Sequence, residues 1–233
     1  MLNIYILTPF PDLVKIVTKN SILGRAEKKG LVSYNIYNFF DYSDPPHNRI
    51  DDYPFGGGKG MILKPEPIFR IINEIKTKNG KNEKYKIIFP TPDGKQYNQN
   101  KAKKLSKCSN IIFICGHYKG IDERVRLKLV TDEISIGDFV LTGGELPSII
   151  ILDSIIRIIP GVLNSYESAE NDSFMTKLLD HPHYTRPEKY EGLQVPNVLL
   201  SGNHQKIDEW RKRKRKEKTK NIRPDLWKKY IKE

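Results

Sequence analysis

The chain has 233 residues, of which 40 are Lys or Arg and 28 are Asp or Glu, so its formal net charge is +12. This length can form one good-sized hydrophobic core, or a larger domain with a small one. The most apolar run, residues 149–159, has 11 residues and contains Asp153 and Arg157. A membrane span needs ~20 apolar residues, so the composition excludes a membrane-spanning helix.

The N-terminus and the cysteines both predict a cytoplasmic protein. The first residues, MLNIYILTPFPD, lack the basic segment and the small-residue cleavage site of a signal peptide. Cys108 and Cys115 have neither CxxC nor zinc-site spacing, which indicates no disulfide framework and no structural zinc. We therefore expect a protein of the reducing cytosol with no membrane partner.

Strand-like and helix-like patterns alternate along the first two thirds of the chain. Apolar runs predict the strands, and apolar residues at helical spacing, such as Ile68, Ile71 and Ile75, predict the helices. In chain order, the expected elements are a strand at 2–7, a helical pattern from Leu13 to Ala26, a strand at 31–40, a helix opened by Pro67 and closed by Asn79 and Gly80, a strand at 85–89, a basic helix around 99–107 and a strand at 110–115. This alternation favours a parallel sheet with helices on both faces.

The sequence changes character after Gly161. Residues 164–173, NSYESAENDS, are polar and lack periodicity, which is typical of a linker. Residues 177–233 contain mostly helical patterns, and residues 206–233 carry 13 basic and 5 acidic side chains, or +8 of the net +12. We expect an α/β domain at 1–163, an interdomain linker at 164–171 and a small basic helical domain at 172–233.

The charge of the C-terminal part favours a nucleic-acid partner. The run RKRKRK at 211–216 lies between Trp210 and Trp227, and basic side chains beside aromatic ones suit a phosphate backbone with exposed bases. A lysine-rich surface that is only solvated is the alternative interpretation.

Glycine-bearing loops follow three of the apolar segments, at 90–94, 116–120 and 137–144. Ligands of open parallel sheets bind beyond the carboxyl ends of the strands, so the three loops could form one pocket; three ordinary turns are the alternative. The run FGGGKGM at 55–61 lacks the ending of a phosphate-binding P-loop. His181 and His183 do not have the helical HExxH spacing, so we expect no metal site.

Two polar positions could support chemistry. Asp153 and Arg157 are four residues apart in an apolar helical pattern and share one face, either as an ion pair or with Arg157 reaching outward to a phosphate. Asp172 lies at the end of the polar segment, where spacing alone favours the N-cap of a following helix over a catalytic role.

Six long motifs occur in the order of one known family. They are DDYPFGGGKGM at 51–61, CGHYKGIDERV at 115–125, SIGDFVLTGGELP at 135–147, PGVL at 160–163, DSFMTKLLDHPHYTRP at 172–187 and YEGLQVPNVLLSGNH at 190–204. Together they closely resemble the bacterial tRNA (guanine-N1)-methyltransferase family of the TrmD type, over nearly the whole chain. His117 and Lys119 stand where the family most often has an arginine and an acid.

The resemblance implies a SPOUT-type α/β fold, in which a parallel sheet domain carries a C-terminal trefoil knot, here at 85–160, and is followed by a small, mostly helical domain. Knots are rare exceptions to chain topology, so periodicity does not predict one. The three glycine loops of that fold hold the methyl donor S-adenosylmethionine. By resemblance, the cofactor-binding residues are Phe89, Pro90, Thr91, Pro92, Gly94, Gly116, Ile136, Gly137, Leu141, Thr142, Gly143 and Gly144.

The implied reaction is methyl transfer to N1 of the guanine at tRNA position 37, beside the anticodon. The family assigns the general base to the residue matching Asp172, and Arg157 matches an arginine that helps hold the nucleotide. The resemblance places Asp180, His183, Tyr184 and Arg186 in a motif that meets the RNA. It also implies a homodimer with the active site at the interface, and a Mg²⁺ requirement is associated with the family.

Three other functions stay open at this point. One is a related methyltransferase with a different target, such as a ribose hydroxyl. Another is a cysteine-nucleophile mechanism through Cys115, although a cysteine that ends a buried strand is more often part of the core. The third is an RNA-binding module without enzymatic activity.

Overall fold

The computed structural model of the chain describes residues 1–80, 83–163 and 172–232. The chain divides into two compact units, Met1–Asn164 and Ser165–Glu233. The linker expected at 164–171 lies outside the described residues. No helix of the described parts is both long and apolar enough to cross a lipid bilayer.

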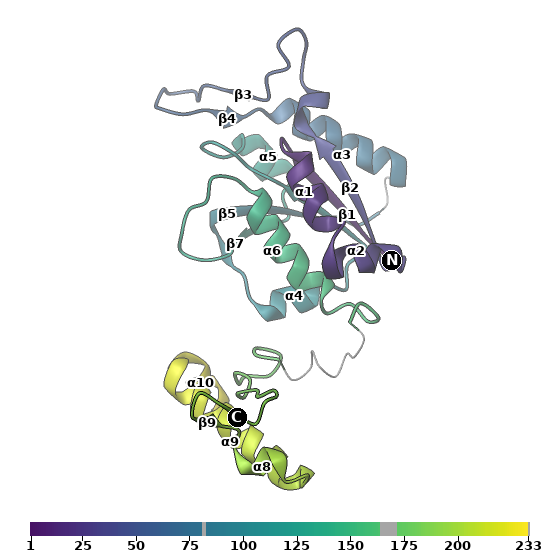
Figure 1. Cartoon of the computed structure of the whole chain (residues 1–233). Coiled ribbons are helices and arrows are strands. Elements are labelled where there is room, and N and C mark those ends of the chain that lie inside the picture. The colour runs from purple at the N-terminus through teal and green to yellow at the C-terminus, as the bar shows by residue number, and fades with distance from the viewer. Residues whose placement is uncertain (81–82, 164–171, 233) are drawn as a thin grey trace. The chain divides into compact units, whose positions relative to one another are not determined.

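The first unit is built on a five-stranded parallel sheet, which confirms the predicted α/β class (Figure 1). The strands lie in the order β2-β1-β6-β5-β7. Their bounds are β1 Leu2–Thr8, β2 Val32–Asn38, β5 Lys86–Gln96, β6 Asn110–Ile114 and β7 Asp132–Ser135. Every residue of the central strand β6 is buried, and a strand covered on both faces is apolar throughout rather than alternating.

Helices cover both faces of the sheet and form two separate buried clusters. One face packs against α1 Pro11–Thr18, α2 Ser21–Lys28, α4 Gln99–Leu105 and α6 Glu145–Ile156. The other packs against η1 Phe39–Tyr42, α3 Pro65–Asn79 and α5 Glu123–Lys128. The isoleucines of α3 that share one face in the sequence pattern are all fully buried, as predicted.

The single helical pattern predicted from Leu13 to Ala26 is wrong, because the chain forms two helices there. It turns between α1 and α2, and Ser21 has a left-handed φ of 52°. The turn is so tight that a Cβ on Gly24 would lie 2.3 Å from the Lys19 carbonyl oxygen. In α1, Val14 is buried, whereas Leu13 and Ile16 are exposed.

Strand β5 is also longer than predicted, since it continues through the first glycine loop. Ile134 of β7 pairs with both Pro90 and Lys95, so residues 91–94 form a bulge inside the strand rather than a loop after it. A Cβ on Gly94 would lie 2.5 Å from the Ile134 backbone nitrogen, so only glycine fits the bulge at this point.

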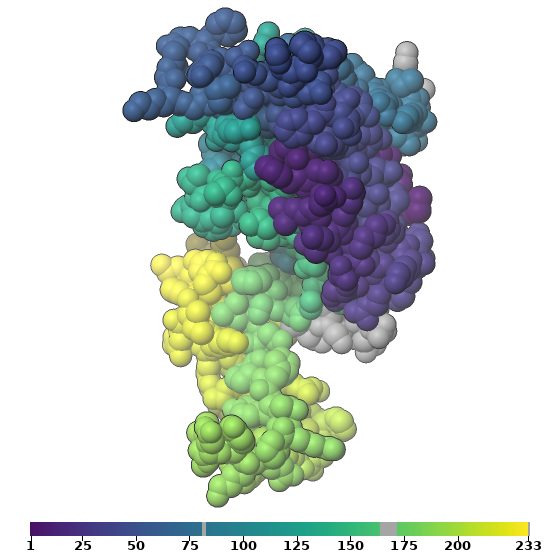
Figure 2. Space-filling view, turned by 45° about the horizontal axis from the view of Figure 1, so that its top comes forward, coloured from purple at the N-terminus to yellow at the C-terminus, as the bar shows by residue number. Residues whose placement is uncertain are grey.

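A glycine-rich arm projects from the first unit (Figures 1 and 2). It contains the short antiparallel pair β3 Asp51–Asp52 and β4 Ile62–Leu63. Phe55, near its tip, is fully exposed.

The second unit is mostly helical and has a small core. Its helices are α8 Asn197–Leu200, α9 His204–Ile222 and α10 Pro224–Tyr230, and a short hairpin of β8 Lys189–Tyr190 and β9 Leu193–Gln194 precedes them. The core contains Leu178, Leu179, Ile207 and Trp210. The buried hydroxyl of Thr219 on α9 accepts a hydrogen bond of 2.9 Å from the Leu179 backbone N–H, which fastens the irregular segment to the helix.

Candidate functional site

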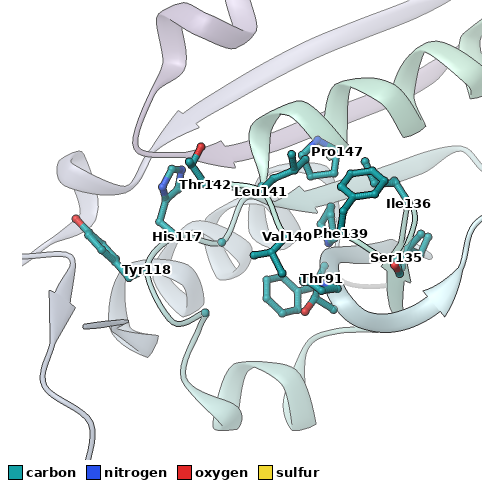
Figure 3. A pocket seen from close by; sticks show the side chains of 18 of the residues that line it. Thr91, His117, Tyr118, Ser135, Ile136, Phe139, Val140, Leu141, Thr142 and Pro147 are labelled. Carbon is teal, nitrogen blue, oxygen red and sulfur yellow. The ribbon is translucent and has the colours of Figure 1, made fainter. Parts of the chain in front are cut away.

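A cavity of about 320 Å³ opens in the first unit beyond the carboxyl ends of β5, β6 and β7 (Figure 3). The bulge of β5 and the loops after β6 and β7 line it, so the three glycine segments do form one pocket. Eleven of the twelve residues predicted to bind the cofactor lie in its wall. The twelfth, Gly94, is absent from the wall because it packs under the bulge against Ile134.

The wall also contains residues that the sequence analysis did not select. They include Ile134, Ser135, Phe139, Val140 and Pro147. Phe139 and Val140 are 54% and 80% exposed, and Figure 3 shows them on the loop that borders the cavity. Two exposed apolar side chains between Gly137 and Gly143 are a signal that could have identified them. They give the pocket an apolar face beside backbone polar groups, as small-molecule sites commonly have.

Two glycines hold the loop after β7 against the loop after β6. The Gly144 N–H donates a hydrogen bond of 2.8 Å to the Gly116 carbonyl, and Gly143 forms a backbone bridge with His117. A Cβ on Gly144 would lie 2.6 Å from the Gly116 nitrogen and 2.7 Å from the Cys115 Cα. Any larger residue would push two backbone segments apart, so glycine at this position sets the shape of the pocket.

A buried polar chain anchors the same region to the sheet. Glu145, the first residue of α6, is only 3% exposed. Its carboxyl group accepts a hydrogen bond of 2.6 Å from the Thr8 hydroxyl at the end of β1, and its other oxygen lies 2.7 Å from Nε2 of His117. These hydrogen-bonded side chains therefore join β1, α6 and the loop after β6 behind the pocket wall. No sequence pattern reveals these contacts, because Thr8, His117 and Glu145 are far apart in the chain.

Arg126 of α5 supports the bulge of β5. Its guanidinium lies over the Phe89 ring at 5.7 Å and donates hydrogen bonds of 2.8 Å to both Asp93 and Glu133. Hydrogen bonds from Thr91 and Arg126 lower the pKa of Asp93, and those from Arg126 lower the pKa of Glu133. Two carboxylates and an aromatic ring thus hold one arginine at the edge of the cavity.

Cys115 is not a nucleophile in this fold. It is fully buried at the end of β6, with Sγ 3.4 Å from the Ser148 hydroxyl. Burial raises the pKa of its thiol, so the reactive thiolate form is disfavoured.

Arg157 is the C-cap of α6 and lies on an exposed face of that helix. Leu146, Ile150, Asp153 and Arg157 are all exposed and lie within about 60° of one another around the helix axis, as their spacing requires. Arg157 therefore shares its exposed face with Asp153 and with two apolar side chains.

The remaining predicted site residues belong to the second unit. Residues 173–175, directly after Asp172, form a turn rather than a helix, so its interpretation as an N-cap is wrong: the Met175 N–H donates a hydrogen bond to the Asp172 carbonyl. Asp180 accepts hydrogen bonds from the His181 N–H at 2.7 Å and from Nε2 of His183 at 2.9 Å. Burial acts to raise the pKa of Asp180, but these hydrogen bonds outweigh it and the pKa is lowered. Tyr184 and Arg186 are exposed.

Comparison with known proteins identifies the family. Residues 2–229 match the family described as tRNA (Guanine-1)-methyltransferase TrmD. The chain is 53% identical over 225 residues to the tRNA (guanine-N(1)-)-methyltransferase of Bacillus pumilus (strain SAFR-032), with 97% of this chain and 91% of that protein covered. Proteins of the same name from Clostridioides difficile (strain 630) and Bacillus subtilis (strain 168) are 53% and 52% identical, with 98% and 97% of this chain and 98% and 93% of theirs covered. The chain therefore belongs to the tRNA (guanine-1)-methyltransferase TrmD family.

Proposed function

We propose that this protein transfers a methyl group from S-adenosylmethionine to N1 of the guanine at tRNA position 37, beside the anticodon. The observation that carries the proposal is the cavity at the ends of β5, β6 and β7, in a chain of this family. The cavity suits an adenosyl group, because its glycine segments expose backbone N–H and C=O groups while Phe139, Val140 and Leu141 offer apolar surface. When bound, S-adenosylmethionine supplies an electrophilic methyl group on its sulfonium.

The close contact of the two loops supports a knotted SPOUT topology in the first unit. The chain after β7 passes so near Cys115 and Gly116 that no side chain fits at Gly144. We therefore assign the knot to residues 85–160 and the methyl transfer to the unit that contains it.

Asp172 is the proposed general base. N1 of neutral guanine carries a proton, so the nitrogen becomes a nucleophile only when a base removes that proton. Asp172 is partly exposed and lies in a turn at the start of the second unit. Arg157 offers a planar donor group for the guanine O6, where negative charge develops.

The exposed face of α6 supports a homodimer with the active site at the interface. Leu146 and Ile150 are 50% and 51% exposed, and on the adjacent α1 Leu13 and Ile16 are 42% and 66% exposed. Several exposed apolar side chains on two neighbouring helices favour an interaction site. Arg157 lies on the same face, so a second copy of the chain would bring this arginine to the shared interface.

The second unit supplies the proposed tRNA contacts. Helix α9 carries the run of basic residues at 211–216, and the Trp227 and Tyr230 rings of α10 stack with centroids 5.5 Å apart. We assign Asp180, His183, Tyr184 and Arg186 to substrate binding on the same unit. A tRNA substrate also implies a cytoplasmic protein. A Mg²⁺ requirement is tested by assaying turnover in the presence of a chelator.

The experiment compares Asp172→Asn with the wild type and with the exposed control Asp41→Asn. Asp172→Asn should bind S-adenosylmethionine and tRNA normally but lose on the order of 10²–10⁴-fold in single-turnover rate. Wild-type turnover in Asp172→Asn would overturn the assignment of the base. A calorimetric titration that detects no saturable S-adenosylmethionine binding would favour an RNA-binding module instead.

The dimer is tested by mixing two inactive chains. Gly143→Arg should block the cavity, because even a Cβ there would lie 2.3 Å from the His117 ring. A mixed dimer of this chain with Asp172→Asn should regain one working site if the partner supplies Asp172. No recovery in mixtures that do form heterodimers would exclude a shared site.

A further inference from the structure

A short irregular segment of the second unit contains a cluster of side chains that can bind a metal ion. Asp180, His181 and His183 each offer a ligand atom, and these atoms all lie within 4.8 Å of one another. Nε2 of His183 lies 2.9 Å from one oxygen of Asp180, and Nε2 of His181 lies 3.8 Å from the other. The helical spacing that argued against a metal site does not apply, because this segment is irregular and folds back on Asp180.

The hydrogen bond on the far side of the His181 ring points to a ligand. Nδ1 of His181 lies 3.0 Å from the Pro182 carbonyl oxygen, which can only accept. Nδ1 therefore donates a hydrogen to this carbonyl oxygen, and Nε2, on the other side of the ring, is the nitrogen that faces the Asp180 carboxyl group. Metal-binding histidines are oriented in this way, with the second nitrogen bonded to a carbonyl or carboxylate.

The ligand atoms of the three side chains converge on one side of the His181 ring. Nε2 of His181 lies 3.8 Å from a carboxyl oxygen of Asp180, and the His181 and His183 rings lie with centroids 4.3 Å apart. All three ligand atoms are close enough to one another to bind a single cation. We propose that Asp180, His181 and His183 bind one divalent transition-metal ion.

The ligand types and spacings define the class of metal. Two imidazoles and one carboxylate suit Zn²⁺, Co²⁺, Ni²⁺ or Fe²⁺, whereas Mg²⁺ prefers oxygen ligands only. Bonds of about 2.1 Å in a tetrahedral site place ligand atoms about 3.4 Å apart, so the observed 2.9 and 3.8 Å need only small side-chain rotations. The His183 side chain is 68% exposed, which leaves room for water in the remaining positions.

The neighbouring charges limit the strength of this site. His181 also lines a cavity of about 440 Å³ together with Arg211, Lys212 and Arg215. Their positive charge opposes a bound cation, and added salt screens that repulsion. Metal binding at this site should therefore not weaken as the salt concentration rises, unlike the binding of Mg²⁺ to exposed carboxylates.

The test is a titration of the full-length protein with Co²⁺, followed by its visible absorption and by tryptophan fluorescence. The Trp210 ring lies 6.3 Å from the His181 ring, so paramagnetic Co²⁺ should quench its emission. We expect one Co²⁺ per chain at this site, displaced by Zn²⁺ but not by a large excess of Mg²⁺. His181→Gln and Asp180→Asn should each weaken binding on the order of ten-fold or more, because one of three ligands is lost.

The matched control is His204→Gln, since His204 is an exposed histidine of the same unit that lies outside the cluster. It should bind Co²⁺ as the wild type does, and Trp210→Phe should abolish the quenching while keeping the absorption bands. Equal affinity in His181→Gln and His204→Gln, displacement by Mg²⁺, or no saturable Co²⁺ binding would each overturn the proposal. None of these measurements requires methyl transfer, so the outcome is independent of the proposed function.

Discussion

Removing the Glu145 carboxyl group should destabilise the first unit more than any surface change. Glu145→Ala leaves the Thr8 hydroxyl and Nε2 of His117 without the partner that they have at 2.6 and 2.7 Å. Each buried polar group left unpaired costs about 1–3 kcal/mol, which gives about 2–6 kcal/mol for the pair. The His117 side chain is 15% exposed, so water can replace part of its bond, and we expect a loss of about 2–4 kcal/mol in the free energy of unfolding.

Two variants bracket this expectation. Glu145→Gln keeps the side-chain volume and one carbonyl oxygen, so it should cost about half as much, roughly 1–2 kcal/mol. Asp138→Ala changes an exposed acid of the same pocket segment and should stay within about 0.5 kcal/mol of the wild type. Glu145→Ala should also weaken S-adenosylmethionine binding, because the loop after β6 loses its anchor to α6.

The assay is urea unfolding followed by far-ultraviolet circular dichroism, which reports the strands and helices of both units. Both tryptophans, Trp210 and Trp227, lie in the second unit, so their fluorescence follows that unit in the same sample. The effect of Glu145→Ala should appear in the dichroism transition. If Glu145→Ala costs no more than Asp138→Ala, the buried chain through Thr8, Glu145 and His117 does not hold the site together.

Three further predictions concern the pocket and the core. Gly144→Ala should lower the melting temperature and abolish S-adenosylmethionine binding, because its Cβ would lie 2.6 Å from a backbone atom. The control Gly57→Ala, in open space at φ +80°, should cost only about 1 kcal/mol of local strain. Equal effects of the two substitutions would refute the argument. Cys108 should react with iodoacetamide in the native protein while Cys115 stays protected, since Cys115 is fully buried and burial raises the pKa of its thiol. Mass spectrometry of the peptides measures the alkylation rate of each cysteine, and similar rates for the two would contradict this prediction. The pKa values of the Asp93 and Glu133 carboxyl groups are lowered, so their contribution to stability is present above about pH 4 and is lost as the pH falls further. Arg126→Gln should reduce this loss of stability at acid pH, measured as the free energy of unfolding in urea at several pH values. An unchanged pH dependence would contradict the role of Arg126.

Local sequence patterns were sufficient for the central strand of the sheet and for a helix that covers one of its faces. Strand β6 is a continuous apolar run, and α3 has isoleucines at helical spacing between a proline and a glycine. The break between α1 and α2 was not predictable, because it depends on the close packing of Gly24 against Lys19. The extension of β5 depends on pairing with Ile134 of β7, which no local pattern of residues 90–96 encodes.

The candidate site was likewise predictable from the sequence only in part. Glycine loops after apolar strands predicted a pocket, since backbone close approach requires glycine at Gly144. The partners of Glu145 are 28 and 137 residues away, so only the folded chain reveals them. The roles assigned to Asp172 and Arg157 came from long motifs rather than from spacing, and spacing alone favoured a helix N-cap at Asp172 that the structure does not contain.

The most direct test of the account is methylation of two tRNAs that differ only at position 37. The protein is incubated with S-adenosylmethionine labelled in its methyl group and with tRNA carrying guanine or adenine at that position, and the products are digested to nucleosides. We predict label in 1-methylguanosine from the guanine tRNA and none from the adenine tRNA. Label in any other nucleoside, or equal labelling of the two tRNAs, would contradict the proposed function.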